Sequence, residues 1–233
     1  MDRFLRTEAL LGKTSMERIK NAKVIVFGIG GVGGHAADAV VRSGVGHIAL
    51  VDSDTVSVTN INRQLIADDS TKGKKKTEVM KEHLLLINPR LTVECFDMFY
   101  TPENADSIDL SKYDYIIDAI DSVPSKVELI TRAFNLNVRV ISSMGFGNKL
   151  SPTMVKVADL SKTQVCPLAR TMRRLLREKG ITHLKTVYSE EIPTTPDSPI
   201  DDGGKRTVGS VSFVPSVAGL VMASEVIKDL AKE

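Results

Sequence analysis

The sequence is poor in the residues that mark several classes of protein. It has only two cysteines, Cys95 and Cys166, in 233 residues. That number argues against a disulfide framework and a four-cysteine zinc site, and it favours a reducing compartment. The sequence also has no run of the roughly 20 apolar residues that a membrane span needs, and its N-terminus lacks the apolar core of a signal peptide. We therefore expect a soluble, cytoplasmic protein with no membrane span in this chain.

An excess of charge of one sign is missing as well. The formal net charge is +2, so overall charge gives no reason to expect nucleic acid. Tryptophan is absent and aromatic residues make up 5% of the chain, which leaves few side chains for stacking on bases. What is present, 42% hydrophobic and 26% charged residues, is ordinary for a globular protein.

Short β-branched segments alternate with helical segments over the first 148 residues. The predicted strands cover residues 23–27, 47–51, 91–95, 115–118 and 138–142, and the predicted helices cover 35–43, 73–87 and 124–134. This alternation is typical of an α/β protein with a Rossmann-like, doubly wound and mostly parallel sheet.

The pattern changes after residue 149. Apolar and polar residues alternate over 150–159, which predicts an antiparallel strand, and 167–179 forms an amphipathic helix. Residues 190–206 are expected to be a mobile loop, 208–214 a strand, and 215–230 a closing helix. The sequence therefore predicts a C-terminal antiparallel extension of the sheet.

A glycine-rich turn, Gly28-Ile-Gly30-Gly31-Val-Gly33, joins the first strand to the first helix of this sheet. Such a turn lets the backbone approach an anion, which the helix N-terminus then binds. Asp52 ends the second strand, where an acid accepts hydrogen bonds from ribose hydroxyls. These features predict a nucleotide site but fit NAD and ATP equally.

The residues after Asp52 favour a triphosphate. Arg63 and Lys76 supply the fixed cations that a triphosphate needs, and the side chains of Asn60, Asn62 and Gln64 can add neutral hydrogen bonds. Lysine is unfavourable at a helix N-terminus unless an anion lies there.

Three carboxylates are candidates for holding a cation. Asp54 could orient a cation or a metal ion. Asp118 and Asp121 end the fourth strand, at the edge of the sheet where ligands bind, and one of them could hold magnesium on the triphosphate.

One helix carries a row of arginines. Arg170, Arg173, Arg174 and Arg177 recur at helical spacing, with no acid placed to pair along the row, and leucines lie opposite. We interpret the row as an exposed stripe that contacts a phosphate backbone. Five more basic residues could extend it: Lys149, Lys156, Lys185, Lys205 and Arg206.

Taken in order, these motifs resemble the ubiquitin-activating-enzyme-like (ThiF/MoeB-type) adenylyltransferases. The segments are GIGGVGG, VDSDTVSVTNINRQ, GKKK, INP and DAIDS, from about residue 3 to 150. The resemblance implies one domain over 1–233, with a nucleotide-binding half (1–148) and a substrate-facing half (149–233). It also implies ATP and Mg2+, with Mg2+ at Asp121, and a homodimer in which Arg6 reaches the partner's ATP. The implied ATP-binding residues are Gly28, Gly30, Gly31, Gly33, Asp52, Asp54, Asn60, Asn62 and Gln64. The implied catalytic residues are Arg63, Lys76, Asp121 and Arg6.

The C-terminal half resembles the threonylcarbamoyl-adenosine dehydratase branch of this family. The matching segments are SMG at 143–145, SKTQVCPLARTMRRLLREKGI, YSEE at 188–191 and GSVSFVPSVAGLVMASEVIKDL. This similarity implies ATP-dependent dehydration and cyclisation of threonylcarbamoyl-adenosine in tRNA through a carboxyl-adenylate, with sulfur-transfer proteins as possible partners. The chain has Cys166 where the branch has aspartate, at the N-cap of a helix, where cysteine is a poor cap.

Other functions remain open at this stage. The chain could adenylate the C-terminal carboxylate of a small ubiquitin-like sulfur-carrier protein, although enzymes of that kind typically have two CxxC pairs and this sequence has none. A non-catalytic nucleotide sensor and an NAD-dependent oxidoreductase are further alternatives. The cationic residues after Asp52 weigh against the oxidoreductase.

Overall fold

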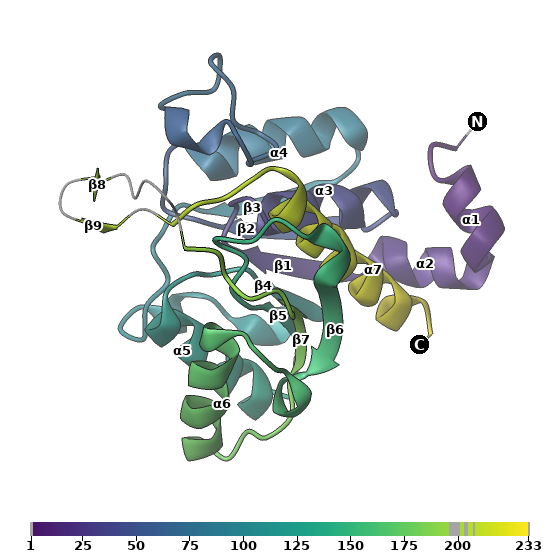
Figure 1. Ribbon diagram of the computed structural model, residues 1–233. Helices are drawn as coiled ribbons and strands as arrows, with labels where there is room; N and C mark the ends of the chain where they lie inside the picture. Colours follow the sequence, from purple (N-terminus) through teal and green to yellow (C-terminus); the bar gives the residue numbers. More distant parts are fainter. Residues whose placement is uncertain (1, 196–200, 203–204, 207, 233) are drawn as a thin grey trace.

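A computed structural model describes residues 2–195, 201–202, 205–206 and 208–232. Strands and helices alternate along the chain and build one large sheet with helices on both faces (Figure 1). The helices are α1 (Leu5–Leu11), α2 (Lys13–Asn21), α3 (Gly33–Arg42), α4 (Lys76–Ile87), α5 (Val123–Asn135), α6 (Pro167–Glu178) and α7 (Phe213–Ala231). The strands are β1 (Lys23–Phe27), β2 (His47–Val51), β3 (Thr92–Phe96), β4 (Tyr115–Asp118), β5 (Arg139–Ser143), β6 (Val155–Asp159), β7 (Lys185–Ser189), β8 (Asp201–Asp202) and β9 (Lys205–Arg206).

The large sheet has seven strands in the order β3-β2-β1-β4-β5-β7-β6. Every neighbouring pair is parallel except β6 and β7, which pair antiparallel with Val157 opposite Val187. The predicted fold class is therefore confirmed, including the antiparallel extension at the C-terminal end. Strands from both halves of the chain share the sheet. The division at residue 148 into a nucleotide-binding and a substrate-facing half stays a prediction.

Each central strand is buried on both sides, which explains its continuous apolar sequence. In β1, Val24 and Val26 pack in the cluster that contains α3 and α7, whereas Ile25 and Phe27 pack in the cluster that contains α5. A third cluster joins α5 to α6 and holds the buried Cys166. The helices thus cover both faces and leave the carboxyl ends of the strands free for a site.

Two expectations for the C-terminal part need correction. The strand β7 was not predicted, because Lys185, Thr186 and Ser189 make its sequence polar, yet Thr186 is fully buried and donates a hydrogen bond to the Ala158 carbonyl oxygen (2.8 Å). The strand predicted over 208–214 is wrong: residues 208–212 are irregular, and α7 begins at Phe213, with Pro215 in its first turn. Proline suits that turn because the first N–H groups of a helix need no partner within it.

The loop predicted over 190–206 lies partly outside the described residues, which omit 196–200 and 203–204. Within the described part of this segment, β8 and β9 form a small antiparallel pair. In the part of the chain that the structure describes, no helix combines the length and apolar character that crossing a membrane requires.

Candidate active site

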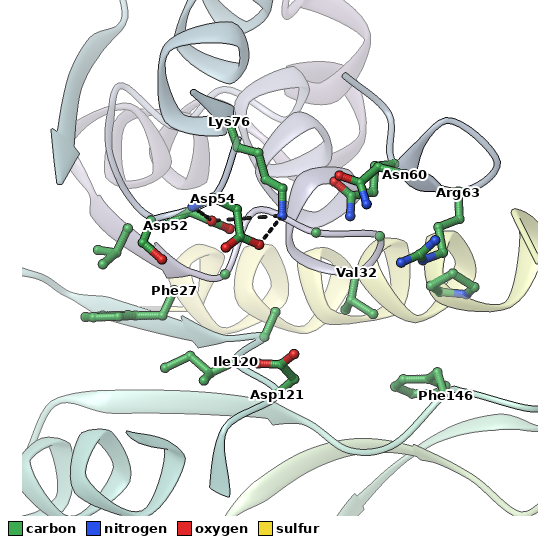
Figure 2. A pocket seen from close by; sticks show the side chains of 18 of the residues that line it. Phe27, Val32, Asp52, Asp54, Asn60, Arg63, Lys76, Ile120, Asp121 and Phe146 are labelled. Carbon is green, nitrogen blue, oxygen red and sulfur yellow. Dashed lines mark hydrogen bonds and ion pairs between the residues drawn. The ribbon is translucent and has the colours of Figure 1, made fainter. Parts of the chain in front are cut away.

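A cavity of about 490 Å3 opens where β1, β2 and β4 end (Figure 2). Its volume is in the range of small-molecule sites. Most of its polar lining comes from segments that follow these strands, because the carboxyl ends of parallel strands meet at one edge of a sheet. The polar lining residues are Asp52, Ser53, Asp54, Asn60, Arg63, Gln64, Lys76, Asp121 and Ser210.

The glycine-rich turn forms the floor of the cavity. Gly28 has a φ of +85°, and a Cβ at this position would lie 2.6 Å from the Ala119 carbonyl oxygen, so only glycine fits. Gly28, Gly30 and Gly31 line the cavity. Gly33 lies beneath the turn instead: a Cβ there would come within 1.9 Å of the Gly28 carbonyl oxygen. Gly33 therefore lets α3 start directly against the turn.

Asp52 and Lys76 lie on one side of the turn. The Asp52 carboxylate accepts hydrogen bonds from the N–H groups of Ile29 (2.6 Å) and Asp54 (2.8 Å). Burial raises the pKa of Asp52 above its usual value, and Lys76 and the two N–H groups oppose that shift only in part. The Lys76 Nζ lies 2.6 Å from Asp54 Oδ2 and 4.0 Å from Asp52 Oδ1. These side chains form a compact group beside the place where a ribose would bind.

Arg63 and Asn60 lie toward the other end of the cavity (Figure 2), and Gln64 also lines the cavity. The Arg63 Nη1 donates to the Thr59 carbonyl oxygen (2.8 Å) and to Asn62 Oδ1 (2.9 Å). Gln64 is buried, and among the described residues its Oε1 has no hydrogen-bond partner. An unpaired buried polar atom is costly, so it favours a bound molecule that completes the hydrogen bonding.

Asn62 is the one predicted ATP-binding side chain that does not line the cavity. Its Nδ2 donates to the Ser210 carbonyl oxygen (3.0 Å), in the segment before α7. The structure therefore gives Asn62 a role in joining two segments and no direct contact with the cavity.

Asp118 and Asp121 have separate roles. Asp118 is completely buried, where its Oδ2 accepts from Lys126 Nζ (2.8 Å) and Ser142 Oγ (2.6 Å), so it is unavailable to a metal ion. Asp121 is exposed and lines the wall opposite Lys76 (Figure 2). Lys126 also donates to the Ile120 carbonyl oxygen (3.1 Å), which fixes the backbone next to Asp121.

The described residues contain no cluster of three or more metal-binding side chains. A dedicated metal cage is thus absent from the part of the chain that the structure describes. One free carboxylate, Asp121, still fits a magnesium ion that is held mainly by phosphates and water.

An apolar end of the cavity was missed from the sequence. Phe27, Met98, Phe99 and Tyr100 line it, and the rings of Phe27 and Tyr100 meet edge to face at 4.9 Å. Burial raises the pKa of Tyr100 to about 12, so its hydroxyl stays neutral at pH 7. The signal that could have found this end is the position of 96–100, which follow the third strand at the same edge of the sheet as Asp52.

The arginine row does not form the uniform exposed stripe that was expected. Arg173 is half-buried and points toward the neighbouring turn, where its Nη1 donates to the carbonyl oxygens of Leu160 (3.3 Å) and Thr163 (2.8 Å). Arg174 pairs with Glu178 (2.9 Å), one helical turn away, so the row does have an acid placed to pair with it. Arg170, Arg174 and Arg177 are all exposed, so three of the four arginines stay candidates for binding phosphate.

Of the five basic residues proposed to extend that row, burial rules out Lys149, and two others are paired with acids. Lys149 is buried and donates to the Ser189 carbonyl oxygen (3.1 Å), and burial lowers its pKa. Lys156 pairs with Glu190 (2.5 Å), and Lys185 pairs with Asp229 (2.6 Å). The side chains of residues 205 and 206 lie outside the described residues.

Arg6 and Cys166 lie away from the cavity. Arg6 is exposed on α1, so it could serve an ATP site only in a second copy of the chain. Cys166 is buried at the N-cap of α6, and its side chain makes no capping hydrogen bond, as expected for cysteine. Burial also excludes the Cys166 thiol as an accessible nucleophile in this structure.

The cavity can hold an aromatic base at its apolar end, a ribose at Asp52 and phosphates on the glycine-rich turn, with Lys76 and Arg63 as cations. This set of groups suits a nucleoside triphosphate, because two cations and the exposed carboxylate of Asp121 line the same cavity as the glycine-rich turn.

Comparison with known proteins supports this interpretation. The ThiF family model matches residues 2–233. The chain is 41% identical to tRNA threonylcarbamoyladenosine dehydratase of Bacillus subtilis, over 100% of this chain and 96% of the relative. It is 35% identical to the Escherichia coli enzyme of the same name, over 98% and 93%. The structure of E. coli TcdA in complex with ATP superimposes with a TM-score of 0.88 at 35% identity, covering 99% of this chain and 94% of that one. These matches confirm the family expected from the motifs, and the chain belongs to the ThiF family.

Proposed function

We propose that this chain is an ATP-dependent dehydratase that converts threonylcarbamoyladenosine in tRNA to its cyclic form through a carboxyl-adenylate. The observation that carries the proposal is the cavity, in which a glycine-rich turn, Asp52, Arg63, Lys76 and Asp121 surround one nucleotide-sized space. Full-length relatives named for this activity support the choice of substrate. The solved complex of a relative with ATP supports the choice of nucleotide.

In the first step, the threonyl carboxylate attacks the α-phosphate of ATP and pyrophosphate leaves. Arg63 and Lys76 offset the negative charge that develops on the phosphates. Lys76 must exchange its contact with Asp54 for a phosphate oxygen, and this exchange is easy because Asp54 is largely exposed. When bound, Mg2+ would screen the phosphates, with Asp121 as its protein ligand.

In the second step, a nitrogen or oxygen of the carbamoyl group attacks the activated carbonyl carbon within the same molecule. AMP leaves with one carboxylate oxygen and the attacking group loses a proton, so the nucleoside loses the elements of water overall. Because the reaction is intramolecular, holding the group in place supplies much of the acceleration. No nucleophile from the protein is needed, which agrees with the burial of Cys166.

A tRNA substrate needs a surface that contacts phosphate. Arg170, Arg174 and Arg177 are exposed on α6, and Arg170 and Arg177, which form no ion pair with an acid among the described residues, could each neutralise one backbone phosphate. A cytoplasmic location follows from the tRNA substrate as a prediction. Partner proteins for sulfur transfer also stay a prediction.

A homodimer is part of the proposal, with Arg6 of one chain at the ATP of the other. Mixing Arg6→Ala chains with Lys76→Met chains tests both points together. A mixed dimer contains one site with an intact Lys76 and an intact Arg6 from its partner. We expect the mixture to regain activity that neither variant has alone. Failure to regain activity after verified subunit exchange would rule out Arg6 acting between chains.

The decisive experiment is nucleoside analysis of tRNA after incubation with the protein and Mg-ATP. We expect the threonylcarbamoyl nucleoside to lose the mass of one water, with release of AMP and pyrophosphate. Formation of an adenylate on a carrier protein, with the tRNA nucleoside unchanged, would instead support the alternative activity on a sulfur carrier.

A further inference from the structure

The segment Val208–Ser210, here called the strap, forms part of the cavity wall. Val208 and Ser210 line the cavity together with Phe146 and Gly147. Val208 is 64% exposed although its side chain is apolar. The strap contacts Asn62, the residue before Arg63, and Gly147, the residue after Phe146. Arg63 and Phe146 lie at the same end of the cavity (Figure 2).

Asn148 holds the strap from one side. The Asn148 N–H donates to the Gly209 carbonyl oxygen (2.7 Å), and the Gly209 N–H donates to Asn148 Oδ1 (2.6 Å). The two segments touch closely, because a Cβ at Gly147 would lie 2.2 Å from Val208 Cγ1. Asn148 has a φ of +57°, a conformation that asparagine and glycine adopt more readily than other residues.

Asn62 holds the strap from the other side and also contacts the predicted phosphate-binding arginine. Its Nδ2 donates to the Ser210 carbonyl oxygen (3.0 Å), while its Oδ1 accepts from Arg63 Nη1 (2.9 Å). One amide group thus connects Arg63 to the strap. The resulting chain of hydrogen bonds runs from Arg63 through Asn62 and the strap to Asn148.

We propose that Asn62 is a positioning residue that couples ATP binding to the placement of the strap, and thereby to the binding of the tRNA substrate. This inference rests on the proposed function, because it takes Arg63 as a phosphate ligand and the modified nucleoside as the second substrate. When phosphates draw the Arg63 side chain into the cavity, the Asn62 side chain must move with it or lose the hydrogen bond that its Oδ1 accepts from Arg63. Either change alters how the strap is held.

Coupling of this kind is a property of binding equilibria and must be reciprocal. If ATP sets the strap in the arrangement that accepts the nucleoside, ATP tightens tRNA binding and tRNA tightens ATP binding by the same factor. Replacing a side chain that merely stabilises the fold would change the tRNA affinity equally with and without ATP, or not at all. The factor between the two affinities would then stay unchanged. The factor therefore separates a positioning role from a structural one.

The test measures the dissociation constant of threonylcarbamoyladenosine-containing tRNA with and without saturating α,β-methylene-ATP, which blocks cleavage between the α- and β-phosphates. The variants are Asn62→Ala and Asn148→Gly. They break the chain of hydrogen bonds at different points, and glycine accepts the backbone conformation of residue 148. The matched control is Asn137→Gly, which removes an asparagine at a similar φ of +55°, outside the cavity.

We expect the analogue to tighten tRNA binding about tenfold in the wild-type chain and in Asn137→Gly. In Asn62→Ala and Asn148→Gly the ratio should fall to about one, while each folded variant still binds tRNA. The two variants break different contacts, so the test can be made with either variant even if the other does not fold. A wild-type ratio near one, or an unchanged ratio in a folded variant, would overturn the coupling while leaving the dehydratase proposal intact. Failure of the wild-type chain to dehydrate the nucleoside would overturn both.

Discussion

Replacing Lys76 by methionine removes a positive charge from the cavity while keeping an unbranched side chain of similar length. In the wild-type chain the Lys76 side chain is 6% exposed, and its Nζ contacts Asp54 at 2.6 Å and Asp52 at 4.0 Å. Asp52 is itself 9% exposed at its side chain. The substitution therefore leaves a largely buried carboxylate without its nearest cation.

Two effects of different size follow from this geometry. Asp54 is 64% exposed and stays hydrated, so most of the stability loss comes from Asp52, and we expect about 2 kcal/mol. That loss lowers Tm by about 4–8 °C for a chain of this length. The effect on catalysis is larger, because one fixed charge at the developing transition-state charge contributes about 100- to 1000-fold in rate.

The pH dependence has a definite sign. Burial already raises the pKa of Asp52, and Lys76 is the main charge that opposes this shift. Without Lys76 the pKa rises further, so Asp52 becomes protonated at a higher pH. As the pH is lowered, ATP affinity of the variant should therefore begin to change at a higher pH than in the wild type.

The assay compares ATP-dependent turnover, Tm and ATP affinity against Lys75→Met. Lys75 is the neighbouring lysine; its side chain is 48% exposed and pairs with Asp97 outside the cavity. Lys75→Met should stay within about twofold of wild-type turnover, since it removes only an exposed ion pair. Turnover of a folded Lys76→Met variant within the range of the Lys75→Met control would refute the catalytic role of Lys76.

The remaining predictions concern residues that do not line the cavity. Arg173→Ala should lower the free energy of unfolding by about 2 kcal/mol in urea titrations, because charged hydrogen bonds to a turn are lost. Arg177→Ala should leave the free energy of unfolding unchanged. It should instead reduce the slope of the logarithm of the tRNA binding constant against the logarithm of salt concentration by about 1. Lys185→Met should cost about 1 kcal/mol at pH 7. Burial alone raises the pKa of Asp229, but hydrogen bonds from Lys185 and Tyr115 lower it overall. The cost of Lys185→Met should therefore shrink as the pH falls below about 3.9, the ordinary pKa of aspartate. A cost that stays constant over this pH range would contradict the prediction. Gly33→Ala should destabilise the chain by about 3 kcal/mol, because its Cβ would collide with the Gly28 carbonyl oxygen; an unchanged urea midpoint would show that the turn can relax.

Elements with a strong local signal could be predicted from the sequence. Buried parallel strands such as 23–27 consist of consecutive β-branched and apolar residues, and the glycine-rich turn can be identified because it lies between such a strand and a helix. In contrast, β7 was missed because its polar residues become buried only through pairing with β5 and β6. Composition favours a strand over 208–214, but in the structure the side chains of Asn62 and Asn148 bond the backbone of residues 209 and 210, and α7 begins at Phe213.

The sequence by itself determined the fold class, the family and the order of the nucleotide-binding motifs, because periodicity and motif spacing are local properties of the chain. Only the tertiary structure decided which polar side chains meet. It buried Asp118 against Lys126 and left Asp121 free in the cavity. It turned Arg173 inward, and it moved Asn62 from the cavity to the strap. Those outcomes depend on contacts between residues far apart in the sequence, for which no local pattern exists.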